Sequence, residues 1–285
     1  DELEPLLQSV QKCIVGNSSA KAAVDMALWD LYGQLYNIPV YKLLGGGRKQ
    51  IVTDITISVN DPDTMVSDSL KAVARGYDCL KMKVGVNPEL DVARLRAVRN
   101  AVGKDIVIRI DANQAWTPKQ AVKILNKMQE LGLDIELVEQ PVSAHDFAGL
   151  KYVTDRSYVP VLADEAVFSP ENAMTILQMG AADLINIKLM KCGGLYEAKK
   201  ITAIAEAAGV EVMLGCMAEE SGIGVTAAAS LGAALKNITR ADLDATFSLK
   251  ELPYEGGFTV KDTRHLILSS DPGLGIKRLK KEMLA

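Results

Sequence analysis

The sequence repeats one pattern: a short β-branched run followed by an amphipathic helical stretch. Runs with strand character cover residues 52–59, 79–84, 106–110, 135–138, 159–163, 184–189 and 210–214, with a weaker candidate at 241–247. Three of the helical stretches, 88–102, 118–131 and 170–179, begin at a proline, which suits the first turn of a helix. Alternating strands and helices predict parallel β-α-β units.

The spacing of polar residues at the ends of these runs predicts whether the β-α-β units form a closed barrel or an open sheet. Successive spacings of 28, 28, 25, 24, 28 and 26 residues separate Lys83, Asp111, Glu139, Asp164, Lys188, Cys216 and Asp242. Eight strands at this period favour an α/β fold of the (β/α)8 TIM-barrel type over an open doubly wound sheet. The C-terminal strand ends of such a barrel form the active-site face. We therefore expect these polar residues to converge on one mouth.

The first fifty residues are predicted to be helical. Residues 18–32 follow Asn17, a suitable N-cap residue, and apolar residues at 24, 27, 28, 31 and 35 have helical spacing. Three consecutive glycines, residues 45–47, predict a loop or domain boundary before the first strand.

Charge and composition exclude several classes of function. The formal charge of this 285-residue chain is −4 and well mixed, which gives no support to a nucleic-acid or anionic-membrane partner. The uncharged stretch 221–235 is too short and too polar to span a bilayer, and the acidic first residues predict no signal peptide. Four cysteines without a Cys-x-x-Cys pair suggest buried thiols in a reducing compartment, so we expect a cytoplasmic protein. Only two histidines are present, which disfavours a histidine dyad or triad.

Three acidic residues, Asp111, Glu139 and Asp164, end consecutive predicted strands. Three carboxylates at one barrel mouth repel one another, so a positive group must lie between them. A hard divalent cation with oxygen ligands, Mg²⁺ above all, meets this need. The alternative is that each acid faces solvent or caps the next helix, and three acids in phase make it less favoured.

Lysines occupy the same level of the predicted barrel. Lys81 and Lys83 are two residues apart on one strand and so point to the same side, and burial beneath the helices would be costly. Lys188 ends another run on the opposite side of the ring by strand count. A neighbouring ammonium group or desolvation lowers a lysine pKa from about 10.4 toward the range needed for general-base work. The alternative is three snorkelling surface lysines.

Together these residues favour abstraction of a proton α to a carboxylate, with a cation and one lysine stabilising the enediolate. The chain resembles the muconate-lactonizing subgroup of the enolase superfamily from about Asn17 onward. The motifs that carry the resemblance are Lys81-Met82-Lys83, Asp111-Ala112-Asn113, Glu139-Gln140-Pro141, Ala163-Asp164-Glu165 and the run from Asn186 to Gly194.

The resemblance implies roles for these residues. Mg²⁺ would be bound by the three strand-end acids already named. Lys83 and Lys188 would be the acid/base catalysts, and Lys81 would assist electrostatically. The mandelate-racemase-like branch is disfavoured, because the position of its histidine base is held by residues 215–217 here.

A further motif narrows the substrate class. Asp242-Leu243-Asp244 resembles the dipeptide-epimerase signature that binds the free α-ammonium group of the substrate. Alternation along a strand predicts that both carboxylates lie on one side. An acid pair that is solvated or caps a helix is the alternative. Cys216, Met217 and Thr56 are expected to line the pocket.

The resemblance also implies a domain organisation. We expect a (β/α)7β barrel over residues 51–247, the last helices of an α+β capping domain over 1–50, and a segment over 248–285 that returns to the cap. The N-terminal part of the cap, with its mobile loop, is expected to precede residue 1. Family members are usually homo-oligomers, so a homo-oligomer is expected here.

The predicted function is a Mg²⁺-dependent dipeptide epimerase that moves a proton at the α-carbon of the C-terminal residue through an enediolate. The alternatives are a cycloisomerase or o-succinylbenzoate synthase of the same subgroup, a metal-independent Schiff-base aldolase using Lys188, and an inactive truncated barrel. The sequence leaves open whether an Ala-Glu type or a hydrophobic dipeptide is used.

Overall fold

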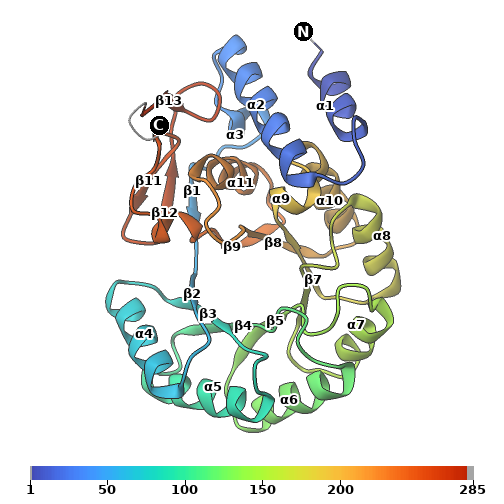
Figure 1. Ribbon diagram of the computed structural model, residues 1–285, viewed down its shortest axis with the longest axis vertical. Coiled ribbons are helices and arrows are strands. Elements are labelled where there is room, and N and C mark those ends of the chain that lie inside the picture. Colours follow the sequence, from blue (N-terminus) through green and yellow to red (C-terminus); the bar gives the residue numbers. More distant parts are fainter. Residues whose placement is uncertain (1, 281–285) are drawn as a thin grey trace. The chain divides into compact units, whose positions relative to one another are not determined.

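The computed structural model describes residues 2–280 and has an α/β fold organised around a parallel sheet (Figure 1). Eight strands follow one another in chain order in this sheet: β2 (Ile55–Ile57), β3 (Cys79–Lys83), β4 (Val107–Asp111), β5 (Ile135–Glu139), β6 (Val161–Ala163), β7 (Leu184–Ile187), β8 (Glu211–Gly215) and β9 (Ile238–Asp242). The predicted TIM-barrel class is therefore confirmed. The chain divides into two compact units, residues 54–186 with 208–211, and residues 1–53 with 187–207 and 212–285.

The unit formed by residues 54–186 contains five strand-helix repeats. Its helices are α4 (Pro62–Ala74), α5 (Pro88–Val102), α6 (Pro118–Glu130), α7 (Phe147–Thr154) and α8 (Pro170–Met179). Four of them carry proline in the first turn and a capping side chain before it, from Asp61, Asn87, Thr117 and Ser169. A cap side chain satisfies an otherwise unpaired backbone N–H, and proline loses nothing there. The starts predicted at the prolines of α5, α6 and α8 are confirmed.

The strand β3 shows how the pleat separates the core from the barrel lumen. Leu80 and Met82 are fully buried, and Ser69 of α4 donates to the Met82 sulfur at 4.0 Å. Met82 therefore faces the helical layer. Because side chains alternate along a strand, Lys81 and Lys83 face the other way, into the lumen.

The second unit joins the remaining strands to helices from the N-terminal and the C-terminal halves of the chain. Its helices are α1 (Leu3–Lys12), α2 (Ser18–Tyr36), α3 (Val40–Leu43), α9 (Leu189–Cys192), α10 (Leu195–Ala207) and α11 (Gly222–Ala234). Small antiparallel sheets are formed by β1 (Gln50–Val52), β11 (Phe258–Lys261) and β12 (His265–Leu268), and by β10 (Tyr254–Gly256) and β13 (Ile276–Leu279). The C-terminal segment reaches α2 and α3: Leu274 donates to Asp30 at 2.6 Å, and Val40 donates to Gly273 at 2.8 Å. Within residues 2–280, no helix is both long and apolar enough to cross a membrane.

Two predicted strands differ from the observed ones. The run 52–59 is split into β1 and β2, which belong to different sheets, because the buried Thr53 and Asp54 between them form polar contacts of their own. Thr53 accepts a hydrogen bond from Leu243 at 2.7 Å, and Asp54 pairs with Arg109 at 2.7 Å. The eighth barrel strand, predicted at 241–247, is β9 at Ile238–Asp242, and a 3₁₀ turn over Ala245–Ser248 follows it.

The helix predicted over 18–32 is present as α2, but the predicted N-cap is wrong. Asn17 has a left-handed backbone (φ +54°) and its side chain caps nothing, donating instead to the Val15 carbonyl. The apolar residues whose spacing indicated the helix lie largely outside its buried face, since Val24, Leu31 and Leu35 are exposed. The buried face consists of Ala22, Asp25, Met26, Trp29 and Gly33.

Asp25 explains why a charged residue lies on that face. Its carboxylate accepts hydrogen bonds from Leu195 N at 2.6 Å and Tyr196 N at 3.2 Å, the first two residues of α10. Unpaired N–H groups at a helix start favour an acceptor there. Burial nevertheless dominates and raises the Asp25 pKa to about 7, with a further upward contribution from Glu197.

We predict that this aspartate makes stability depend on pH. Between about pH 4 and pH 7 the folded state holds a proton on Asp25 that the unfolded state has lost, so the free energy of unfolding falls as pH rises through this window. Asp25→Asn mimics the protonated form. The free energy of unfolding of the variant, minus that of the wild type, should therefore be about 2 kcal/mol larger at pH 8 than at pH 5 when both are measured by urea unfolding.

The matched control is Asp63→Asn, an exposed aspartate in the first turn of α4. Its stability difference from wild type should be the same at both pH values. A pH-independent difference for Asp25→Asn as well would contradict the prediction.

Candidate active site

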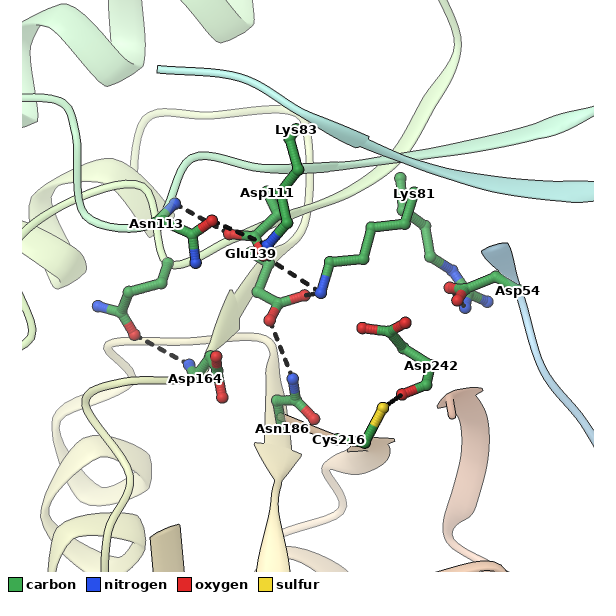
Figure 2. A network of polar contacts seen from close by, with 12 residues as sticks. Asp54, Lys81, Lys83, Asp111, Asn113, Glu139, Asp164, Asn186, Cys216 and Asp242 are labelled. Carbon is green, nitrogen blue, oxygen red and sulfur yellow. Dashed lines mark hydrogen bonds and ion pairs between the residues drawn. The ribbon is translucent and has the colours of Figure 1, made fainter. Parts of the chain in front are cut away.

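The centre of the candidate site is the buried lysine Lys81. Its side chain is 2% exposed, and its ammonium nitrogen lies 3.2 Å from Asp111 Oδ2 and 2.8 Å from Glu139 Oε2 (Figure 2). Both carboxylates are at the C-terminal ends of their strands, β4 and β5, and they lie directly opposite each other in the parallel register. The ammonium group therefore neutralises charges that could not otherwise remain buried side by side.

Lys83 lies one pleat further along the same strand. Its side chain is 30% exposed, and its Nζ lies 2.6 Å from Asp111 Oδ2 and donates to Asn113 Oδ1 at 2.9 Å. The strand register pairs Lys83 with Asp111 and Lys81 with Arg109. Lys83 is thus the more accessible of two amines that share one carboxylate.

Asp164 follows β6 and completes the predicted set of three acids. It is 1% exposed, like Asp111 and Glu139 almost wholly buried at a strand end. Three carboxylates and the two ammonium groups of Lys81 and Lys83 sum to one negative charge. Buried carboxylate oxygens carrying excess negative charge are the donor set that Mg²⁺ prefers, so the residues fit this ion chemically.

The carboxylates nevertheless do not surround a single point. Among the described residues 2–280, no three acidic, histidine or cysteine side chains are close enough together to hold a metal ion. The physical reason lies in the contacts above: Lys81 bridges Asp111 and Glu139, and Lys83 also contacts Asp111. Metal ligation by this set stays a prediction.

A second polar layer in the lumen was missed by the sequence analysis. Arg109 is buried and pairs with Asp54 Oδ2 at 2.7 Å and Glu136 Oε2 at 2.5 Å. Burial acts to lower the Arg109 pKa, but Asp54, Cys79 and Glu136 outweigh it and raise the pKa above its ordinary value. Burial has the opposite effect on the neighbouring Cys79 thiol and raises its pKa. The signal for this layer was present in the alternation Arg109, Asp111 along one strand.

Gln140 holds the loops that carry the acids, a role the sequence analysis also missed. Its buried side-chain oxygen accepts from Asp164 N at 2.9 Å and Ala166 N at 3.1 Å, while its amide nitrogen donates to Val142 O at 3.0 Å. One amide thereby joins the loop after β5 to the loop after β6.

Asn186 on β7 adds a further support for the acids. It donates to Glu139 Oε1 at 3.0 Å and is fully buried. Lys81 contacts the other oxygen of the same carboxylate. Glu139 is therefore held on both oxygens.

Thr56, predicted to line the pocket, lies on β2. It pairs with Lys81 in the parallel register of β2 and β3 and is half-buried. This places it at the level of the buried amine. Contact with a ligand stays a prediction.

The remaining predicted residues belong to the other compact unit and are described within it. Lys188 lies directly after β7 with a 9% exposed side chain, next to the start of α9. The buried Glu220 is a charged neighbour of Lys188 and accepts from Met217 N at 2.8 Å. Burial raises the Glu220 pKa, and Lys188 acts to lower it. Met217 is exposed, and its contact with a ligand stays a prediction.

Asp242 and Asp244 are positioned differently from each other. Asp242 ends β9 and is buried, while Asp244 lies beyond the strand with a helical backbone (φ −90°, ψ −5°) at the start of the 3₁₀ turn. The strand therefore ends before Asp244, and alternation along a strand does not extend to it. Burial first, and then the charges of Asp242 and Asp244, raise the pKa of the Cys216 thiol, so both carboxylates act on the same group. Cys216 is buried and its thiol donates to the Asp242 carbonyl at 3.2 Å. Of the four cysteines, Cys13 is exposed, contrary to the expectation of burial.

Comparisons with known proteins cover nearly the whole chain. A family model described as "Enolase C-terminal domain-like" matches residues 65–281, and one described as "Mandelate racemase / muconate lactonizing enzyme, N-terminal domain" matches residues 1–45. The chain is 53% identical over 277 residues to the L-Ala-D/L-Glu epimerase of Clostridium acetobutylicum, covering 97% of this chain and 77% of that protein.

Two solved structures show the same likeness. The substrate-liganded L-Ala-D/L-Glu epimerase from Bacillus subtilis matches with a TM-score of 0.94 at 48% identity, covering 97% of this chain and 77% of that one. The dipeptide epimerase from Enterococcus faecalis, complexed with Mg and the dipeptide L-Leu-L-Tyr, matches with a TM-score of 0.93 at 49% identity and the same coverage.

We predict that Lys81 is required to hold the buried acids together in the absence of metal. Lys81→Met keeps the length and packing of the side chain but leaves two buried carboxylates without this ammonium group. Breaking a buried pair in this way should lower the free energy of unfolding by about 3 kcal/mol in EDTA, measured by urea titration.

Lys127→Met is the matched control, because Lys127 pairs with Glu130 on the exposed face of α6. An exposed pair contributes about 1 kcal/mol or less. Adding Mg²⁺ should recover part of the stability of Lys81→Met and leave the control unchanged. Equal losses in both variants would contradict the assigned charge balance.

Proposed function

The chain belongs to the mandelate racemase / muconate lactonizing enzyme family of the enolase superfamily, and on this premise we propose that it is a Mg²⁺-dependent dipeptide epimerase. The reaction is transfer of a proton at the α-carbon of the C-terminal residue of a dipeptide, through an enediolate. The observation that carries the proposal is the buried cluster of Lys81, Lys83, Asp111 and Glu139 at the C-terminal edge of a parallel sheet.

Lys83 and Lys188 are proposed as the two acid/base catalysts. Lys83 lies on β3 and Lys188 directly follows β7, four strands further along the eight-stranded sheet. In the proposed reaction the two amines would approach the α-carbon from opposite sides. One amine removes the proton and the other returns a proton to the opposite face, which inverts the carbon.

Asp111, Glu139 and Asp164 are proposed to hold Mg²⁺. The bound ion would supply positive charge to the substrate carboxylate as negative charge develops on it. Lys81, buried among the acids, adds a second fixed positive charge at the same place. Gln140 and Asn186 keep the carboxylates oriented and so reduce the reorganisation needed during the reaction.

Asp242 and Asp244 are proposed to bind the α-ammonium group of the dipeptide. Asp242 is a buried strand-end carboxylate and Asp244 is half-buried, which makes a substrate ammonium group a suitable partner. Known relatives of similar identity include one named for an Ala-Glu substrate and one solved with L-Leu-L-Tyr. Both types carry the free ammonium group.

The two-base proposal predicts a face-selective loss of exchange. In D₂O with Mg²⁺, the wild type should exchange the α-proton of both L,L- and L,D-dipeptides, read by mass spectrometry. Lys83→Ala should lose exchange from one epimer by a factor of about 10³ or more, and Lys188→Ala should lose it from the other.

Lys71→Ala, an exposed lysine on α4, serves as the control and should retain both exchanges. EDTA should abolish exchange and Mg²⁺ should restore it. Metal-independent turnover, or trapping of a substrate adduct on Lys188 by borohydride, would instead indicate a Schiff-base enzyme.

The acid pair can be tested separately with blocked substrates. Asp242→Asn and Asp244→Asn should each lower kcat/KM for a free dipeptide by about 30-fold or more, the loss expected when one partner of a buried charge pair is removed. The N-acetylated dipeptide lacks the ammonium group, so its kcat/KM should hardly change. Unchanged turnover of the free dipeptide in both variants would refute the role of the pair.

A further inference from the structure

Two hydrogen bonds link three side chains in series, beginning at Lys83. Lys83 Nζ donates to Asn113 Oδ1 at 2.9 Å (Figure 2). Asn113 Nδ2 in turn donates to Glu165 Oε1 at 3.1 Å. Asn113 lies in the loop after β4 and Glu165 in the loop after β6. The contacts therefore connect the amine on β3 to a carboxylate that follows β6, three strands further along the sheet in the same compact unit.

The chemistry of the two ends fixes how Asn113 is oriented. An ammonium group offers only donors and a carboxylate offers only acceptors. A carboxamide between them can satisfy both in one orientation alone, with its oxygen toward Lys83 and its nitrogen toward Glu165. Both ends therefore favour the same orientation, and Glu165 helps to hold the Asn113 oxygen toward the amine.

Asn113 depends on such an anchor because it is open to solvent. An exposed asparagine side chain rotates freely unless a second contact holds it, and Oδ1 would then be lost to Lys83 for part of the time. Its backbone is already fixed in the left-handed region (φ +42°) by a hydrogen bond from its N–H to Asp111 Oδ1 at 2.9 Å. Rotation of the side chain is the motion that remains, and the contact with Glu165 restricts it.

Glu165 is itself held rigidly. The backbone N–H groups on either side of it, those of Asp164 and Ala166, both bind the buried Gln140 side chain. The carboxylate lines a hollow of about 500 Å³ together with Gln114 and His145. Within residues 2–280 its Oε2 is buried without a hydrogen-bond partner, an unfavourable arrangement that packing alone does not explain.

We propose that Glu165, acting through Asn113, is a positioning residue for the amine of Lys83. Asp111 alone would hold Lys83 against the proposed metal ligands, and Asn113 gives the amine a second fixed acceptor. The inference rests on the proposed function, since the position of the amine matters when Lys83 exchanges a proton with the substrate. A displacement of about 1 Å can reduce the rate of such a step by a factor of up to about 10².

Two substitutions at one position separate the hydrogen bond from the charge. Glu165→Gln keeps an oxygen that can accept from Asn113 Nδ2, and Glu165→Ala removes it. In D₂O, Glu165→Ala should slow α-proton exchange by about 10-fold or more for the epimer that Lys83→Ala also abolishes. Exchange of the other epimer should stay within about 3-fold of wild type, and Glu165→Gln should stay within that limit for both.

Asn172→Ala is the matched control, since Asn172 supports the same loop by accepting from Phe168 N at 3.1 Å. It should leave the ratio of the two exchange rates unchanged. Equal slowing of both epimers by Glu165→Ala, wild-type rates in that variant, or equal loss in Glu165→Gln and Glu165→Ala would each overturn the proposal.

Crystal structures of the two Glu165 variants give a readout that needs no activity. Glu165→Ala should release the Asn113 side chain and move Lys83 Nζ from its 2.9 Å contact, and Glu165→Gln should preserve both. An unmoved Lys83 in Glu165→Ala would refute the proposal. If the wild type exchanged neither epimer, the proposed function would fail, and the structures would still decide the positioning role.

Discussion

The interaction on which the site depends is the contact of one buried ammonium group with two buried carboxylates. Lys81, Asp111 and Glu139 are all nearly inaccessible to solvent, and none could remain charged there alone. Strand geometry brings the ammonium group and the two carboxylates together, because Lys81 is on the lumen side of β3 and the acids end the next two strands. The fold therefore stabilises a charged centre that an ordinary hydrophobic core would exclude.

Around this centre, support comes from amides rather than from further charges. Asn186 fixes one oxygen of Glu139, Gln140 fixes the backbone beside Asp164, and Asn113 contacts Lys83. Neutral amides can donate and accept at once and leave the charge balance unaltered. The loops after β4, β5 and β6 are thereby connected by hydrogen bonds that begin and end at the functional groups.

Sequence alone was sufficient where a regular repeat sets the geometry. The period of 24 to 28 residues identified the barrel class, and alternation placed Lys81 and Lys83 on one side of β3. Prediction from the sequence failed where the backbone departs from the regular strand-helix repeat. Asp244 lies past the end of its strand, and Asn113 has a positive φ that its residue type only permits. Contacts such as that of Asn113 with Glu165 join residues 52 positions apart and have no local signal.

The hydrogen bonds of the Gln140 side chain constrain how the sequence of such an enzyme can evolve. Because one buried amide ties together the loops that carry the acids, a mutation there disturbs several functional groups at once, and those loops are poorly suited to gradual variation. The loop after β8 is different: Met217 is exposed, and Glu219 adopts a positive φ in a turn of its own. A new substrate preference would most readily arise by altering that turn, while the residues proposed to transfer the proton stay unchanged.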